Sequence, residues 1–169
     1  MTYFELYDLP ISLKIDAAQL KQKFYALSRK YHPDFYSNST EEEQADVLEK
    51  SALVNKAFKT FSKEDEIIKY VLQLKGLLQD DEKYQLSADF LMEVMELNEQ
   101  LVEAKMEDDA VAMTNIKSEI SNFQSTIYEP VKAIVEHYKE TVTTQEELLQ
   151  VKEYYYRKKY LARILDSLG

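Results

Sequence analysis

The residues at positions 32 to 34, His32, Pro33 and Asp34, are those whose types and spacing most directly indicate a function. His32 is one of only two histidines in the 169-residue chain, and there is no cysteine. Histidine-based nucleophilic triads and zinc sites therefore have almost no residues to be built from. Pro33 stiffens the turn, Asp34 presents a carboxylate to a basic partner, and His32 adds a polar contact. The tripeptide is typical of a docking loop rather than of an active site.

A helix expected over residues 17–31 positions this loop. Asp16 offers an N-cap, and Pro33 prevents easy continuation of the helix beyond His32. Apolar residues at spacings of four, three and four form one stripe of this helix: Leu20, Phe24, Leu27 and Tyr31. A basic face flanks the stripe, with no acidic residue between positions 17 and 33: Lys21, Tyr25 and Arg29, with Lys23 and Lys30 nearby. These charges would steer the protein toward an acidic surface. The alternative is that the tripeptide only ends a helix and the lysines form a solvated face.

Three further helical segments complete the first half of the chain. A brief one over residues 3–9 is closed by Pro10. A longer one follows the loop, because Ser39 or Thr40 can cap a run that opens with glutamates at 41–43. Its apolar side comprises Val47, Leu48, Ser51, Val54, Ala57, Phe58 and Phe61. The last covers residues 63–74. We therefore predict two antiparallel helices joined by the docking loop, with short flanking helices.

Composition favours an almost entirely helical protein. Two glycines and three prolines are too few for many β-hairpins, and β architecture is unlikely on this ground. The formal net charge of −10 weighs against binding to nucleic acid or to anionic membranes, both of which need clustered Lys and Arg. Residues 76–169 hold 10 Lys and Arg against 19 Asp and Glu, so the acidity lies in the second half. A basic partner surface fits this charge better.

The predicted domain boundary lies at Gly76, where a glycine precedes a short acidic run that ends at Glu82. We expect a first domain over 1–75, a linker over 76–86 and a second domain over 87–169. The amino end has neither a positive segment nor an apolar one, and no apolar run approaches the length of a membrane span. We therefore expect a cytoplasmic protein without cofactor or metal. His137 lacks a second ligand nearby and is expected to be a surface residue.

The second half opens with a helix expected over residues 87–104. A narrow apolar sector must face the core of a small bundle: Phe90, Val94, Leu97 and Leu101. Leu91 and Met95 lie toward one flank, and four residues point away from the core: Met92, Glu96, Glu99 and Glu103. Methionine beside carboxylates suits a partner that displays Lys or Arg. The alternative is that a bundle of three helices buries Leu91 and Met95 as well.

The rest of the chain fills in the bundle. Residues 104–139 form a long helical stretch that Pro130 should bend or break. A capping box at 143–147 starts a final helix that runs to about Leu168. Its basic residues, at 157–159 and Arg163, are expected to pair with acids of neighbouring helices, and a nucleic-acid patch is a poor second interpretation. Paired carboxylates such as Glu96 and Glu99 make an enzyme conceivable, but neighbours on an exposed helix lack the desolvation that separates an acid from a base.

The stretch from Phe24 to Asp34, followed by residues 53–58, resembles the J-domain family of co-chaperones. This resemblance implies a J-domain, in which an antiparallel helix pair carries the His-Pro-Asp loop, and a role in activating DnaK-type chaperone ATPases. It implies that the chaperone is bound by His32, Pro33, Asp34, Lys21, Tyr25, Arg29 and Lys30. The chain departs from the common pattern at Phe35, where many J-domains have a basic residue, and at Ala26. Partner choice is therefore expected to differ.

Residues 89–101 and the opening residues 3–10 are similar to the HscB family, the J-proteins dedicated to iron-sulfur cluster assembly. This likeness covers essentially the whole chain and implies an all-α fold with a carboxyl-terminal three-helix bundle. It implies two protein partners, the HscA chaperone and the cluster scaffold IscU, and no catalysis by the chain itself. The implied scaffold site comprises Leu91, Met92, Met95, Glu96, Glu99, Glu103 and Tyr154. The register at Tyr154 stays open, because this residue belongs to a run of three tyrosines. The alternative is a general J-domain co-chaperone with another client.

Overall fold

A computed structural model describes residues 1–166, and every regular element in that range is helical. The elements are α1 (Tyr3–Leu6), α2 (Ala17–Lys30), η1 (Pro33–Tyr36), α3 (Glu41–Phe61), α4 (Glu64–Leu74), α5 (Ala88–Met106), α6 (Ala110–Tyr128), η2 (Glu129–Val131), α7 (Lys132–Glu136) and α8 (Gln145–Asp166). The predicted all-α class is therefore confirmed. The predicted end of the last helix near Leu168 lies outside the described residues.

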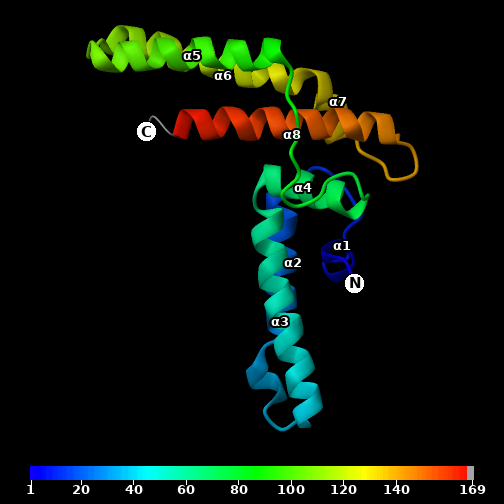
Figure 1. Cartoon of the computed structure of the whole chain (residues 1–169). Coiled ribbons are helices and arrows are strands. Elements are labelled where there is room, and N and C mark those ends of the chain that lie inside the picture. The colour runs from blue at the N-terminus through cyan, green and yellow to red at the C-terminus, as the bar shows by residue number, and fades with distance from the viewer. Residues whose placement is uncertain (167–169) are drawn as a thin grey trace.

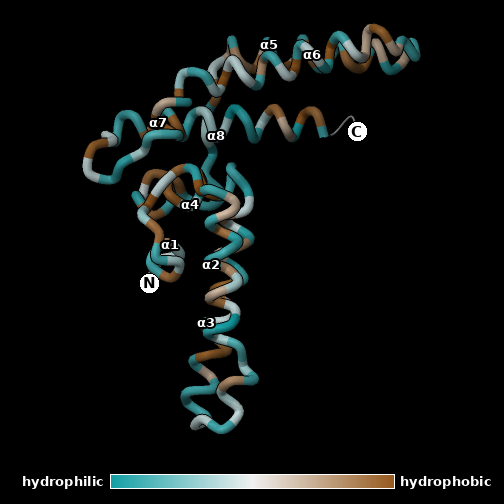
Figure 2. The backbone as a smooth tube through the Cα atoms, turned by 180° about the vertical axis from the view of Figure 1, so that it is seen from behind, coloured by the Kyte–Doolittle hydropathy of each residue, from teal (hydrophilic) through white to brown (hydrophobic). Residues whose placement is uncertain are grey.

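Helices α2 and α3 form a long antiparallel hairpin whose free end carries η1 (Figure 1). Both predicted caps are present: Asp16 Oδ2 accepts the Gln19 N–H at 3.3 Å, and Thr40 Oγ1 accepts the Glu43 N–H at 3.2 Å. The apolar stripe of α2 faces α3, and the Phe24 ring stacks on Phe58 with centroids 4.2 Å apart. Brown and teal alternate along both helices, as expected for helices with one buried side (Figure 2).

One prediction for α3 is wrong. Leu48 was expected on the apolar side of the helix, but its side chain is 61% exposed. The buried side of α3 is narrower and follows Val47, Val54, Ala57 and Phe61. Leu48 lies about 100° around the helix from Val47, which takes it off the stripe that faces α2.

Helices α1 and α4 close the base of the hairpin. Phe4 is buried against Phe61 with ring centroids 4.9 Å apart, and the Tyr70 hydroxyl accepts the Tyr3 N–H at 2.9 Å. Tyr7 reaches the core of the hairpin, where its buried hydroxyl donates to the Val54 carbonyl at 2.7 Å. Burial raises the pKa of Tyr7 to about 12, so the hydroxyl keeps its proton and this bond persists across the physiological range.

The segment predicted as a linker is fixed to α8 rather than free. Gly76 has φ +70°, and the Leu77 N–H donates to the Leu72 carbonyl at 2.9 Å, which ends α4 in a Schellman turn that glycine tolerates best. Further along, Glu82 accepts from Lys152 Nζ at 2.7 Å. Tyr84 stacks on Tyr156, with centroids 4.6 Å apart and planes 4° from parallel. These contacts hold the segment across α8.

Helices α5, α6 and α8 form the predicted three-helix bundle (Figure 1). The expected break at Pro130 is present, since α6 gives way there to η2 and then to α7. A turn at residues 107–109 separates α5 from α6, with Asp108 at φ +52° and the Asp109 carboxylate capping α6. Thr144 and Glu147 form the predicted capping box at the start of α8.

The hairpin and the bundle share one core. Buried residues from both halves belong to a single apolar cluster in which α4 packs against α8. Ion pairs join the halves at the edge of this contact: Lys158 with Asp65 at 2.8 Å, Lys14 with Glu136 at 3.6 Å and Lys75 with Glu140 at 3.0 Å. The molecule is thus an arm, the hairpin, mounted on a bundle (Figure 1). The division into residues 1–75, 76–86 and 87–169 stays a prediction.

Candidate functional site

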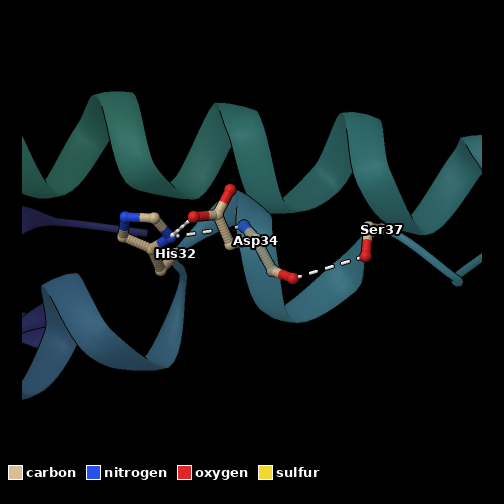
Figure 3. A network of polar contacts seen from close by, with 3 residues as sticks. All are labelled: His32, Asp34 and Ser37. Carbon is tan, nitrogen blue, oxygen red and sulfur yellow. Dashed lines mark hydrogen bonds and ion pairs between the residues drawn. The ribbon is translucent and has the colours of Figure 1, made fainter.

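The loop at residues 32–34 is a capped turn at the far end of the hairpin. His32 is the N-cap of η1: its Nδ1 accepts the Asp34 backbone N–H at 3.2 Å and lies 3.7 Å from the Asp34 carboxylate (Figure 3). Because Nδ1 accepts a hydrogen bond, we assign the ring hydrogen of the neutral form to Nε2, on the side away from Asp34. Pro33 occupies the first turn of η1, where its missing N–H costs nothing. All three side chains are exposed and can meet a partner.

Two residues that sequence analysis did not select hold this loop in place. Gln44 of α3 donates through Nε2 to the carbonyls of Tyr36, Ser37 and Ser39 at 3.1, 3.1 and 3.3 Å. Tyr36 in turn donates its hydroxyl to the Lys30 carbonyl at 2.8 Å, which joins the loop to the end of α2. The position of Gln44 in the sequence does not predict this role, because its hydrogen-bond partners are backbone atoms that only the fold brings near.

The predicted basic face lies on α2 next to the loop. Four side chains of this face are exposed: Lys21, Tyr25, Arg29 and Lys30. Lys21 Nζ lies 6.0 Å from the centre of the Tyr25 ring, and that ring is 50% exposed. Phe35 extends the surface beyond the loop, with its side chain 73% exposed and its ring 5.9 Å from that of His32. The structure therefore places Arg29, Lys30 and the loop at the free end of the hairpin, whereas Lys21 lies near the start of α2, beside its base.

The second predicted surface lies on α5, on the side turned away from α6 and α8. Met92 and Met95 are 61% and 54% exposed, and the carboxylates of Glu96, Glu99 and Glu103 are exposed around them. The alternative that Met95 belongs to the core is therefore wrong. Leu91 is partly buried against the core and partly open, so it forms the inner edge of this surface. Adaptable apolar side chains ringed by acids are suited to a basic protein surface.

The structure does not bring Tyr154 to this surface. Its side chain is 6% exposed and packs on Tyr128 with ring centroids 5.3 Å apart, and burial raises its pKa. Of the three successive tyrosines of α8, the one that lines the same groove as Leu91 is Tyr156. Three successive tyrosines give the helix no apolar-polar contrast, so the pattern could not tell which of them faces the core. The Tyr156 hydroxyl donates to Glu82 at 2.8 Å, and burial together with this carboxylate raises its pKa.

Two absences within the described residues concern metal ions and membrane spans. Residues 1–166 contain no group of three or more His, Cys, Asp or Glu side chains placed to hold a metal ion. No helix within that range is long and apolar enough to cross a membrane. His137 is exposed, as predicted.

Comparison with known proteins identifies the family of the chain. A family described as "HSCB C-terminal oligomerisation domain" matches residues 86–169. Over 171 aligned residues the chain is 31% identical to the co-chaperone protein HscB homolog of Shewanella halifaxensis, covering 99% of this chain and 95% of the relative. The chain belongs to the HscB family. The iron-sulfur cluster co-chaperone protein HscB of Homo sapiens, another relative, is 30% identical over 98% of this chain and 66% of its own length.

The HscB fold is shared as well. The crystal structure of human co-chaperone protein HscB superposes with a TM-score of 0.78, at 30% identity, over 99% of this chain and 80% of the human one. This HscB chain therefore keeps both the hairpin and the bundle of its relative.

Proposed function

We propose that this HscB chain is a co-chaperone of iron-sulfur cluster assembly that stimulates the ATPase of a DnaK- or HscA-type chaperone and delivers the scaffold protein IscU to it. The observation that carries the proposal is the whole-chain likeness to relatives named as HscB co-chaperones, together with an exposed His-Pro-Asp loop. The chain itself catalyses no reaction in this account. A cytoplasmic location is part of the proposal.

The hairpin end supplies the contact with the chaperone. Its loop presents the His32 imidazole and the Asp34 carboxylate on a turn that is stiffened by Pro33 and held by Gln44. A rigid loop loses little conformational freedom when it binds. The cations of α2 provide long-range attraction to an acidic face of the chaperone, which orients the loop as it binds. Binding favours ATP hydrolysis and traps the client in the tight-binding state of the chaperone.

The α5 surface supplies the contact with the scaffold. Leu91, Met92 and Met95 offer apolar area, and the neighbouring glutamates set the preference for a partner rich in Lys and Arg. Because the hairpin and the bundle share one core, a scaffold bound on α5 is held at a defined distance from the loop. Tethering the client and the activating loop on one body raises their effective concentrations at the chaperone.

The steady-state ATPase rate of the cognate HscA-type chaperone tests the first contact. We expect His32→Gln to reduce stimulation to the basal rate, because glutamine lacks the ring that caps η1 and presents Nε2. His137→Gln is a matched control, since it removes the only other histidine from an exposed position. Full stimulation by His32→Gln would refute the assignment of the loop.

Affinity for the scaffold, measured by calorimetry, tests the second contact. We expect Met92→Ala to weaken binding roughly tenfold, as truncating an apolar residue at the centre of an interface commonly does. Val111→Ala serves as control, because that side chain is also exposed, at 72%, but lies on α6. Unchanged binding by Met92→Ala and Glu99→Lys would refute the α5 site, whereas no binding of the scaffold by the wild-type chain would favour a general J-domain co-chaperone with another client.

A further inference from the structure

The segment that leads into α5 crosses α8 (Figure 1). Residues of this segment and of α8 line a groove of about 470 Å³. Leu86, Leu91 and Tyr160 form its apolar lining, and three cations stand around them: Lys83, Lys159 and Arg163. Leu91 also belongs to the α5 surface, so the groove opens directly beside that surface.

The cations of the groove have no acidic partner in the part of the chain that the structure describes. Among the ion pairs of residues 1–166, none involves Lys83, Lys159 or Arg163. Lys158 pairs with Asp65 of α4, and Arg157 pairs with Glu153 of its own helix. The prediction that the basic residues at 157–159 and Arg163 pair with acids of neighbouring helices therefore holds for Lys158 alone among the described ion pairs.

The one carboxylate that lines the groove is already engaged. Glu82 accepts from Lys152 and from the Tyr156 hydroxyl at 2.7 and 2.8 Å, and these bonds lower its pKa. Each of its two oxygens thus already accepts a hydrogen bond, and the described ion pairs join it to Lys152 and not to Lys159 or Arg163. Arg163 lies over the Tyr160 ring at 5.3 Å, an arrangement that orders the guanidinium and leaves its donor edge available. The result is a positive, aromatic-lined groove in a half of the chain that is otherwise strongly acidic.

Leu91, Met92 and Met95 form an exposed apolar strip on α5. The charges on the two sides of this strip have opposite signs. At about 100° per residue along α5, Leu91 and Met95 lie nearer the groove, whereas Glu96 and Glu103 lie on the far side. A partner that covers the strip thus meets cations along one border and carboxylates along the other. Such a pattern fixes the orientation of the partner, because turning it around would place like charges together.

We propose that this groove binds an acidic segment of the scaffold protein that carries aliphatic or aromatic side chains, and so sets the direction in which the scaffold lies on α5. The inference rests on the proposed function and adds a second contact of opposite charge to it. The acidic side chains of the segment pair with Lys159 and Arg163, and its apolar side chains lie against Leu86 and Tyr160.

Calorimetry with the purified scaffold protein and the full-length chain tests the charge of the groove. We expect the double variant Lys159→Glu, Arg163→Glu to bind about tenfold more weakly at low salt, and the difference to shrink at high salt. The double variant Lys117→Glu, Lys132→Glu has the same change in net charge at exposed positions outside the groove, and it should bind within about twofold of wild type. Equally weakened binding by both double variants would overturn the proposed role of the groove, because it would show only an effect of net charge.

Photo-crosslinking identifies what occupies the groove. Gln85 lines it, is exposed and carries no charge, so p-benzoylphenylalanine at that position leaves the cations intact. We expect crosslinks to map to an acidic stretch of the scaffold with bulky apolar residues. Crosslinks to a basic stretch, or none while the scaffold still binds, would overturn the inference but not the proposed function. If the wild-type chain fails to bind the scaffold at all, the proposed function fails, and the inference fails with it.

Discussion

Leu72 is the residue at which the link between the hairpin and the bundle can be tested most directly. Its side chain is completely buried in α4. Asp65, Ile68 and Leu72 recur at spacings of three and four and so share one side of that helix. The Asp65 carboxylate pairs with Lys158 of α8 at 2.8 Å, which identifies that side as the one facing the bundle.

The expected effect of Leu72→Ala follows from this burial. Removing a fully buried leucine side chain costs about 3 kcal/mol, the sum of lost transfer free energy and the cavity left behind. This is a large part of the roughly 5–15 kcal/mol that stabilises a typical domain. For a chain of this size it corresponds to a fall in Tm of about 9 °C.

Urea unfolding with hydrogen exchange resolved by residue is the suitable assay, because it reports on α2 and α8 separately. We expect Leu72→Ala to lower protection in both helices by the same free energy, since one core joins them. Leu74→Ala is the control: that side chain is 37% exposed two residues further along α4 and should cost less than about 1 kcal/mol. Loss of protection in α2 alone, with α8 unchanged, would refute a shared core.

Three further predictions concern side chains that form hydrogen bonds. Hydrogen bonds from Lys152 and Tyr156 hold the pKa of Glu82 below its usual value, so their stabilisation is present above that value and is lost as pH falls through the lower folded pKa. Glu82→Gln should therefore destabilise the protein by about 1 kcal/mol at pH 7, with a difference in Tm that shrinks as pH falls below the usual pKa of a glutamate; a constant difference would contradict this. Tyr7→Phe leaves the Val54 carbonyl without its buried partner and should cost about 1–2 kcal/mol in urea unfolding, and no loss would show that water replaces the hydroxyl. Gln44→Ala should speed hydrogen exchange in the loop after Asp34 and reduce ATPase stimulation with little change in Tm, whereas normal stimulation would show that the loop needs no such support.

The features that sequence predicted well are local. Asp16, Thr40 and Thr144 cap the helices they were expected to cap, because capping depends on one side chain and a backbone N–H two or three residues away. Periodicity likewise placed Phe24 on the face of α2 that meets α3, and the position of Pro130 gave the break after α6.

The features that sequence missed depend on contacts between distant segments. The contacts of residues 76–86 are one case, because Glu82 and Tyr84 are held by residues of α8 about seventy positions later, and composition gives no sign of such contacts. The choice between Tyr154 and Tyr156 also required the fold, since both have the same side chain and differ only in which neighbour covers them. Gln44 is a third case, because its role exists only once the loop has folded over it.

The central claim is that the chaperone-binding loop and the scaffold-binding surface must act from one molecule. Its most direct test mixes two variants, His32→Gln with an intact α5 surface and Met92→Ala, Glu99→Lys with an intact loop, and measures the chaperone ATPase rate with the scaffold present. We predict that the mixture fails to restore the scaffold-dependent stimulation given by the wild-type chain, because neither variant tethers the scaffold to a working loop. Restoration to the wild-type rate would contradict the account, since it would mean that the two surfaces act independently.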